Sequence, residues 1–384
     1  MRKAQDWGQP CPNPDCSLYK SMHKGNVRAI SPYRTHSGKR RILRCAQCTM
    51  CFSETRDTVF FDLRTSEEKG MMALKMLLVK VDVAGIRFVL GVTEETVLAW
   101  LARAAHTAQE IHVHVLRELP VTQGQLDEMG NFIERKHACE TDTAGESWPD
   151  GEEGRQGVWI SCAPECRLMI AAVVGPRTRD TATEVVAATK ARVAGIPVCF
   201  SDGFTCSLAT RIAAFHVVTT FASTGRRGRP RKPLCAPHPD LVYGQWVTQK
   251  QQGKLLTRST RVVLGAERLP HLGFTSSTAV VERVHLPLRQ ALAPLARKTS
   301  SFCKDRERMR QRVVFFQAFS NAARPHMRVR QPLPLHARTC HGAMCPRWRE
   351  RTPAMAAGVT DHVWTFRALL TATFEPLDSQ SISG

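Results

Sequence analysis

Two pairs of closely spaced cysteines near the N-terminus constrain this chain more than any other feature of its sequence. Cys11 and Cys16 flank Pro-Asn-Pro-Asp, and Cys45 and Cys48 flank Ala-Gln. Each pair can bind one side of a tetrahedral Zn²⁺ ion through its thiolates, and the two pairs together complete a site. The basic, turn-rich segment 1–60 is therefore predicted to be a zinc-ribbon-like module around one structural zinc ion.

The other cysteines leave two questions open. Cys51 could replace Cys45 or Cys48 as a ligand, and the alternative for the whole set is unrelated buried thiols. The chain has 14 cysteines, but Met1–Asp6 lacks the apolar stretch of a secretion signal, so we expect thiols and a cytoplasmic protein. The longest apolar run, Leu168–Val174, is too short to span a bilayer, and no membrane partner is expected.

The charge of the chain points to its partner. Lysine and arginine number 54 against 34 acidic residues, a formal net charge of +20, and most of the surplus lies after residue 203. Such a surplus favours nucleic acid or an anionic surface as the partner. The 384 residues are 43% hydrophobic, which allows two or three domains with a buried core and excludes wholesale disorder.

Segment 66–117 has the pattern of a helix-turn-helix. Gly91 allows a tight turn, and Thr93 can cap the helix that follows it. Apolar residues recur at helical spacing on both sides of the turn: Ile86, Val89 and Leu90 before it, and Val97, Trp100, Leu101 and Ala104 after it. Beside a basic ribbon this pattern favours DNA binding, and the alternative is a purely structural pair of helices.

Segment 121–325 alternates in the order strand, strand, strand, helix, strand, helix. The expected strands are Gln125–Ile133, Val158–Cys162, Leu168–Val174 and Ile196–Phe200, and the expected helices are Thr181–Ala194 and Ser207–Phe215. This order predicts a ribonuclease-H-like core of mixed α/β class. The chain as a whole is therefore expected to be a multidomain α/β protein, with a basic C-terminal tail over 326–384.

Three acids occupy positions where such a core can bind metal. Asp127 lies in the expected first strand, Asp202 just past the fourth, and Glu282 early in a later helix. Three converging carboxylates can hold two hard divalent ions, and two such ions stabilise both oxygens of an in-line phosphoryl displacement. His285 and Arg289 share the helical face of Glu282 and could meet the phosphate. The alternative is a set of ordinary surface carboxylates.

A basic insertion near 222–262 separates the second and third acids. Its core, Gly228-Arg229-Pro230 between Arg227 and Arg231, resembles an AT-hook, in which an extended Arg-Gly-Arg enters the minor groove of A·T-rich DNA. The alternative is a solvated basic linker. The candidate DNA contacts are Arg227, Arg229, Arg231, Arg283, His285, Arg289, Arg297 and Lys298.

The order of these parts resembles that of bacterial insertion-sequence transposases with an Asp-Asp-Glu core, and it is most similar to the family of insertion sequence one. The residues that carry the resemblance are the cysteine pairs, Leu126-Asp-Glu, Ser201-Asp-Gly, Val281-Glu-Arg, Asn321–His326 and Arg351–Trp364. The resemblance implies that Asp127, Asp202 and Glu282 are a catalytic triad that uses Mg²⁺ or Mn²⁺. It also implies that the N-terminal modules bind the ends of the mobile element, and we expect a homo-oligomer on DNA in the nucleoid.

The chain departs from the family pattern at three places. Met129 and Gly130 follow the first acidic pair where family members often have an aromatic residue. His285 replaces an asparagine, and Pro287 lies inside the helix expected to carry Glu282. Two functions therefore stay open: an active transposase that cuts and joins double-stranded DNA, or a catalytically inactive copy that acts only as a DNA-binding protein or regulator.

Overall fold

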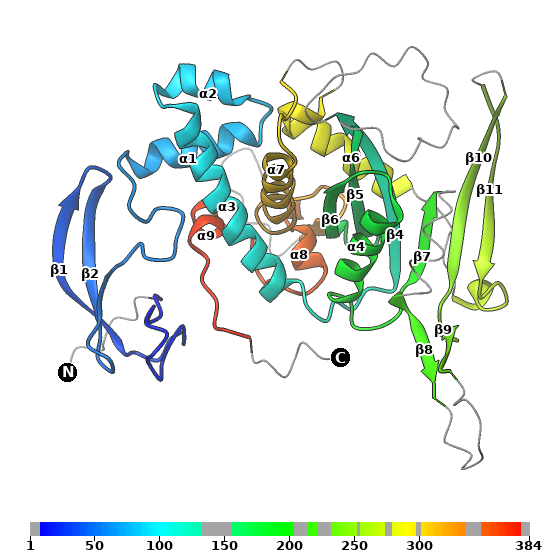
Figure 1. Cartoon of the computed structure of the whole chain (residues 1–384), viewed down its shortest axis with the longest axis horizontal. Coiled ribbons are helices and arrows are strands. Elements are labelled where there is room, and N and C mark those ends of the chain that lie inside the picture. The colour runs from blue at the N-terminus through cyan, green and yellow to red at the C-terminus, as the bar shows by residue number, and fades with distance from the viewer. Residues whose placement is uncertain are drawn as a thin grey trace.

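The chain folds around a six-stranded mixed sheet, and a smaller three-stranded sheet lies near its N-terminus (Figure 1). The computed structural model describes residues 8–132, 155–202, 210, 214–220, 232–251, 254–272, 279–296, 301–334 and 347–377. Over these residues the protein is of mixed α/β class, as the sequence predicts. None of the helices described there is both long enough and apolar enough to cross a membrane.

The N-terminal sheet is an antiparallel ribbon. It consists of β1 (Val27–Thr35), β2 (Gly38–Cys45) and β3 (Cys51–Ser53), paired in that order. Its own apolar core is small, comprising Val27, Leu43 and Phe52. A module with so little buried apolar surface needs a further source of stability, such as a metal ion or contacts with the rest of the chain.

Three helices follow the ribbon: α1 (Glu67–Leu77), α2 (Val83–Leu90) and α3 (Glu94–Val115). Gly91 ends α2 with a left-handed φ of 63°, and the Thr93 hydroxyl accepts a hydrogen bond from the Thr96 amide at the start of α3. The expected turn is therefore present. The expected apolar face is partly wrong, because Val89 is 61% exposed and only Ile86 and Leu90 of that set are buried.

The main sheet has the strand order β11-β10-β7-β4-β5-β6. Its strands are β4 (Gln123–Phe132), β5 (Arg155–Ala163), β6 (Leu168–Gly175), β7 (Val198–Asp202), β10 (Tyr243–Gln251) and β11 (Lys254–Leu264). β4, β5 and β6 form an antiparallel meander. β7 returns parallel to β4, β10 is parallel to β7, and β11 closes the far edge antiparallel to β10.

The two faces of this sheet bury different helices. On one face Leu126 and Trp159 pack against Val185 of α4 (Arg179–Lys190). On the other face lie α3, α6 (Ala279–Ala291) and α7 (Arg306–Ala318), whose apolar side chains join Met129 and Ile160 in the largest core cluster. Successive residues of β4 therefore alternate between two cores, as strand geometry requires.

Side chains from the C-terminal half cover the edge strand β6. Asn321, in the short π-helical turn Phe319–Ala323, accepts a hydrogen bond from the Met169 amide and donates one to the Met169 carbonyl. Gln317 donates to the same carbonyl, and Arg306 donates to the carbonyl of Val174. These contacts satisfy backbone groups that an open sheet edge would otherwise expose.

The C-terminal segment packs against the earlier modules. α8 (Pro353–Ala356) lies beside the β5–β6 turn, and α9 (Phe366–Thr371) buries Leu369 and Leu370 in the largest core. Beyond α9, Phe374 stacks on His114 of α3, and the Glu375 carboxylate accepts a hydrogen bond from the Met22 amide in the segment before β1. The described part of the predicted tail 326–384 thus ties the ribbon to the helices.

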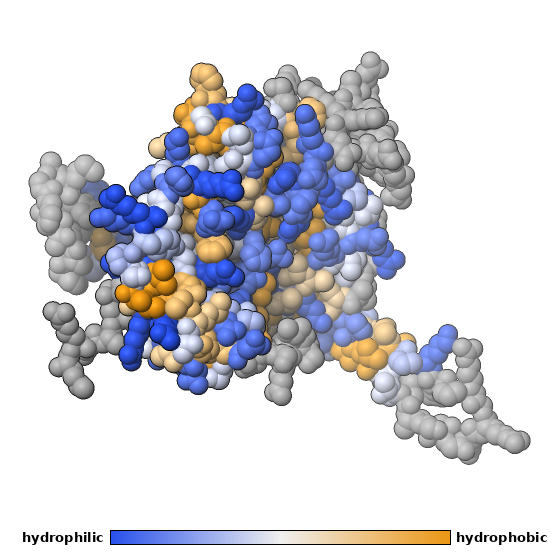
Figure 2. Space-filling view, turned by 60° about the vertical axis from the view of Figure 1, so that its left-hand side comes forward, coloured by the Kyte–Doolittle hydropathy of each residue, from blue (hydrophilic) through white to orange (hydrophobic). Residues whose placement is uncertain are grey.

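Two small hairpins and two 3₁₀ turns complete the described elements. They are β8 (His216–Thr219) with β9 (Leu234–Pro237), β12 (Gln331–Pro332) with β13 (Trp348–Arg349), and the turns Leu269–Leu272 and Ala293–Leu295. Val217, Val218 and Leu234 are 39%, 48% and 58% exposed. Figure 2 shows a corresponding apolar patch where this hairpin leaves the body of the molecule.

All four strands expected in the core region, and its first helix, are present within a few residues of their expected ends. The helix expected at Ser207–Phe215 lies mostly outside the described residues. Four further strands, β8, β9, β10 and β11, are not predicted from the sequence; they flank or lie within the segment interpreted as a basic insertion.

We expect Asn321→Ala to lower the free energy of unfolding by about 1–3 kcal/mol. The buried Met169 amide would lose its acceptor, whereas its carbonyl would keep Gln317 as a donor. Urea unfolding monitored by circular dichroism measures the change. The exposed Gln290→Ala in α6 is the control and should change stability by less than about 0.5 kcal/mol. An equally small change for Asn321→Ala would contradict this role.

Candidate functional site

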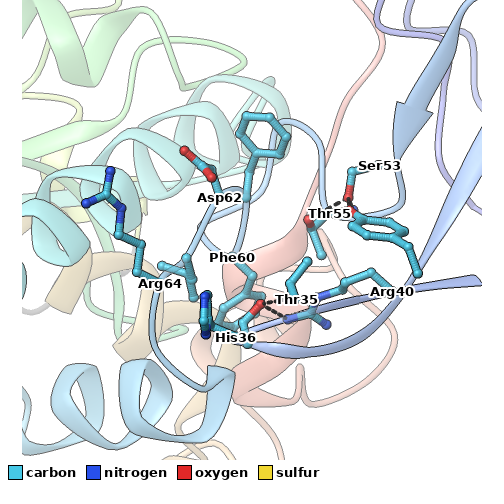
Figure 3. A pocket seen from close by; sticks show the side chains of 12 residues that line it. Thr35, His36, Arg40, Ser53, Thr55, Phe60, Asp62 and Arg64 are labelled. Atoms are coloured by element: carbon cyan, nitrogen blue, oxygen red, sulfur yellow. Dashed lines mark hydrogen bonds between the residues drawn. The ribbon is translucent and has the colours of Figure 1, made fainter.

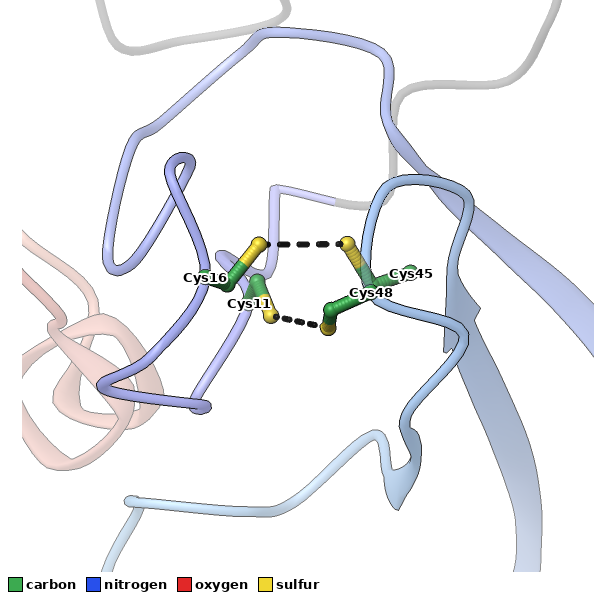
Figure 4. Close-up of side chains that lie close together, drawn as sticks. All are labelled: Cys11, Cys16, Cys45 and Cys48. Atoms are coloured by element: carbon green, nitrogen blue, oxygen red, sulfur yellow. Dashed lines mark hydrogen bonds between the residues drawn. The ribbon is translucent and has the colours of Figure 1, made fainter.

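The four N-terminal cysteines converge on one point (Figure 4). Their sulfur atoms lie within 4.8 Å of one another, with Cys11 Sγ 3.5 Å from Cys48 Sγ and Cys16 Sγ 4.0 Å from Cys45 Sγ. Four thiolates around tetrahedral zinc, each about 2.3 Å from the ion, lie about 3.8 Å apart. The arrangement therefore has the dimensions of a zinc site, and the cluster can bind structural Zn²⁺.

The surroundings of the sulfur atoms suit metal ligation. The Met50 amide lowers the pKa of the Cys48 thiol to about 6, although burial opposes it, while burial raises the pKa of Cys11 above its usual value. Asn26 Nδ2 donates to Cys45 Sγ at 3.3 Å, which orients a ligand in the way that the surroundings of a metal site do. Cys51 is exposed and lies outside the group, so Cys45 and Cys48 complete it.

A buried ion pair joins the ribbon to the helices that follow it. Arg40 Nη1 of β2 lies 2.9 Å from Glu67 Oε2 of α1, and Arg367 of α9 pairs with the same carboxylate. A cavity of about 730 Å³ opens next to it and is lined by Tyr33, His36, Phe60 and Arg64 among others (Figure 3). The cavity separates the ribbon from the segment before α1 and contains none of the three predicted catalytic acids.

The parallel pairing of β4 with β7 brings Asp127 and Asp202 together. Leu126 is directly opposite Ser201, so the next residues, Asp127 and Asp202, are also neighbours across the pair. Residues opposite each other in a parallel pair project to the same face, and Asp127 shares the face of Met129, which packs toward α6 and α7. Both carboxylates are half-buried on that face.

A side chain of β4 fixes the helix that carries the third acid. Gln125 Oε1 accepts hydrogen bonds from the Val280 and Val281 amides at 3.2 and 3.1 Å. These are unpaired amides of the first turn of α6, so Gln125 caps the helix from the sheet. Glu282 directly follows Val281 in this first turn, and its side chain is exposed. The three acids of the prediction are thus gathered by one strand pair and one helix.

The pKa of Asp127 is raised in part by the charges of the other two acids. Burial, followed by the charge of Asp202, raises the pKa of Asp127 to about 8, and the charge of Glu282 contributes in the same direction. The Glu128 amide donates to Asp127 Oδ1 and opposes this shift. A nearby positive charge would favour the ionised form of Asp127 at neutral pH, and a divalent cation supplies such a charge.

The carboxylates are less tightly grouped than the cysteines. Among the described residues, only the four cysteines bring three or more candidate ligand atoms within 4.8 Å of one another. Acids that straddle two ions about 3.5–4 Å apart need not be so close together. The set Asp127, Asp202 and Glu282 therefore stays a prediction as a magnesium or manganese site.

His285 lies against Asp127 and not at the surface. It is 8% exposed, and its Nδ1 is 3.7 Å from Asp127 Oδ2. Burial, with a contribution from Arg289, lowers the pKa of His285 to about 4, so the ring is neutral at pH 7. His285 is therefore the least accessible of the described DNA-contact candidates, since Arg283 is exposed and Arg289 half-buried.

The neighbouring acid Glu128 belongs to the opposite face. Its carboxylate lies 3.0 Å from Arg177 Nε and rests above Gly157, where a side chain would collide with it. Burial raises the pKa of Glu128 to about 7 despite the pairing with Arg177. Alternation along β4 therefore separates Glu128 from Asp127, and Glu128 takes part in a structural ion pair.

Several predicted contacts cannot be located. Arg227, Arg229, Arg231, Arg297 and Lys298 lie outside the described residues. Comparison with known proteins adds no assignment, because no protein-family model matches this chain and no curated protein matches it significantly. We therefore infer the function from the geometry of the two sites.

We expect the purified protein to contain one Zn²⁺ per chain, measured by elemental mass spectrometry. Cys48→Ser should abolish zinc binding, because it removes one of four ligands, whereas the exposed Cys51→Ser should retain the metal. Hydrogen exchange after chelation should show protection lost over β1–β3 but kept in β4–β7, since the ribbon has little core of its own. Protein without zinc, or equal loss in both variants, would contradict the assignment.

Proposed function

We propose that this chain is a DNA transposase that uses Asp127, Asp202 and Glu282 to cleave DNA and transfer the freed strand. The observation that supports this most is the convergence of the acids. The β4–β7 pair aligns the two aspartates, and Gln125 ties the start of α6, and with it Glu282, to the same strand. Three carboxylates on one face in a strongly basic chain suit a metal-dependent reaction on phosphate.

The strand order supports interpreting the sheet as a ribonuclease-H-like core. Three antiparallel strands, β4 to β6, are followed by α4 and by β7 parallel to the first strand, and β10 continues the parallel part. The carboxylates come from the first strand, from the end of the fourth, and from a helix packed on the sheet. This is the arrangement that the sequence resemblance implies.

The proposed chemistry assigns each residue a role. Asp127 and Asp202 would bind Mg²⁺ or Mn²⁺ from the sheet, and Glu282 from α6. The ions would stabilise the attacking and leaving oxygens of the phosphoryl displacement. In the first step a water oxygen bonds to phosphorus as the bond to the 3′ oxygen breaks, which frees a 3′-hydroxyl. In the second, the oxygen of that hydroxyl bonds to a target phosphorus as the bond from this phosphorus to the 3′ oxygen of the target strand breaks, and the proton of the attacking hydroxyl is balanced by the one that the departing oxygen takes up.

The N-terminal modules suit recognition of the element's ends. The zinc-ribbon interpretation is supported by the four convergent cysteines on a basic antiparallel sheet, and the helix-turn-helix interpretation by α2, Gly91 and α3. We propose that the partners are the element's ends and target DNA. The protein would act as a homo-oligomer on DNA in the nucleoid of a bacterial cytoplasm.

A second candidate function is an inactive copy that only binds DNA. The observation that favours it is Pro287, which lies inside α6 and leaves the helix without one backbone donor close to Glu282. The helix nevertheless runs unbroken from Ala279 to Ala291.

We expect Asp202→Asn to lower Mg²⁺-dependent nicking of a labelled duplex bearing the element's ends by more than about 100-fold. The substitution keeps the shape of the side chain but removes a negative ligand, so DNA binding should persist or tighten. The matched control is Asp180→Asn, an exposed acid in the first turn of α4, which should cleave normally.

Undiminished cleavage by Asp202→Asn would refute the triad. Pro287→Thr distinguishes the two candidate functions, because it restores a backbone donor near Glu282 and should raise activity if the proline is the lesion. No cleavage by the natural chain or by Pro287→Thr, with DNA binding intact, would favour the inactive copy.

A further inference from the structure

Five basic side chains from three distant segments form a group, here called the arginine cluster, of which only Arg283 has so far been named as a candidate DNA contact. Its members are Arg167 in the β5–β6 turn, Arg283 in α6, and Arg324, His326 and Arg328 in the segment after the π-helical turn. Arg283, Arg324 and Arg328 are exposed, and Arg167 and His326 are half-buried.

Hydrogen bonds hold two of these three segments, the β5–β6 turn and residues 324–328, in place. Asn321 binds both backbone groups of Met169, which places the start of the 324–328 segment beside the β5–β6 turn. The His326 amide donates to the Arg351 carbonyl at 2.9 Å, and the Arg328 amide donates to His326 Nδ1 at 3.1 Å. The backbone that carries Arg324, His326 and Arg328 is therefore held by hydrogen bonds to other parts of the chain.

The members of the cluster repel one another. Burial, followed by the charges of Arg283 and Arg328, lowers the pKa of Arg167. Burial and the charges of Arg167, Arg324 and Arg328 likewise lower the pKa of His326. Positive charges gathered in this way are unfavourable in the isolated protein and become favourable when they bind an anion.

Among the described residues, no acidic side chain is paired with the four guanidinium groups to offset this repulsion. Over the residues that the structure describes, none of them forms a side-chain ion pair or hydrogen bond. Arg167 also adopts a left-handed φ of 62°, which an arginine occupies at an energetic cost. Strain together with uncompensated charge is characteristic of a binding surface and not of a stabilising one.

The surface continues beyond the cluster with an aromatic side chain. The Arg330 guanidinium lies 4.1 Å from the centre of the ring of Trp348, which is 42% exposed and lies in β13 opposite Pro332 of β12. Arg347 and Arg349 flank this tryptophan and are exposed. A run of arginines over several segments matches an extended polyanion better than a single small ion.

We propose that the arginine cluster binds the phosphate backbone of duplex DNA beside the catalytic carboxylates. Its position relative to them follows from α6, in which Arg283 directly succeeds Glu282. The cluster would hold the strand to be cut, and its charge would offset the repulsion between phosphate and the three acids. This inference rests on the proposed function, since it takes DNA to be the substrate.

The test is the salt dependence of DNA binding by the full chain, measured by fluorescence anisotropy with a labelled random-sequence duplex. Arg283→Gln with Arg328→Gln should reduce the slope of log Kobs against log[KCl] by about two, because each arginine that neutralises a phosphate contributes about 0.9. Arg283→Lys with Arg328→Lys keeps the positive charge and should therefore keep the slope. Arg179→Gln with Lys190→Gln removes the same charge from exposed positions at the two ends of α4 and should change the slope by less than about 0.5.

The measurement is made without divalent metal on the Asp202→Asn chain, so it reports binding even if the catalytic proposal fails. Equal slopes for the cluster pair and the α4 pair would overturn the inference. An unchanged duplex slope with a reduced slope on single-stranded RNA would overturn the assignment to duplex DNA. If the variant with Arg283→Gln and Arg328→Gln fails to fold, the variant with Arg324→Gln and Arg328→Gln replaces it. Both of its positions are exposed, and the same reduction of the slope is expected.

Discussion

The parallel pairing of β4 with β7 determines how the main sheet and its acidic residues are arranged. It aligns Asp127 with Asp202 on one face, and it commits alternate residues of β4 to two separate cores. Because the two strands are far apart in the sequence, the chain between them must cross the sheet, and α4 makes that crossing while burying Val185 against Trp159. The position of the acids is thus a consequence of core packing.

Bringing the three acids close together has an electrostatic cost. The pKa of Asp127 rises to about 8 because burial and Asp202 disfavour its charge, and the neutral His285 beside it supplies no compensating charge at pH 7. Positive charge lies instead in the arginine cluster, of which Arg283 adjoins Glu282 on α6. Separate acidic and basic groups along one helix would let a cation and a phosphate backbone occupy neighbouring positions.

Local features of the sequence predict much of this molecule. The cysteine spacing identifies all four members of the cluster, and apolar periodicity finds β4–β7 and α4, because each signal depends on nearby residues. Contacts between segments that are distant in the sequence were not predicted. The contact of His285 with Asp127 and the covering of β6 by Asn321 depend on tertiary contacts between distant segments. Val89 was misassigned because helical spacing alone cannot tell which flank of an apolar stripe meets the core.

We propose that the three acids Asp127, Asp202 and Glu282 form one divalent-metal site. Anomalous scattering from crystals grown with Mn²⁺ tests it most directly. We expect anomalous density between Asp127 and Asp202, with Glu282 from α6 contributing a ligand. Manganese bound only at other acids, with these three carboxylates without metal at saturating Mn²⁺, would contradict it.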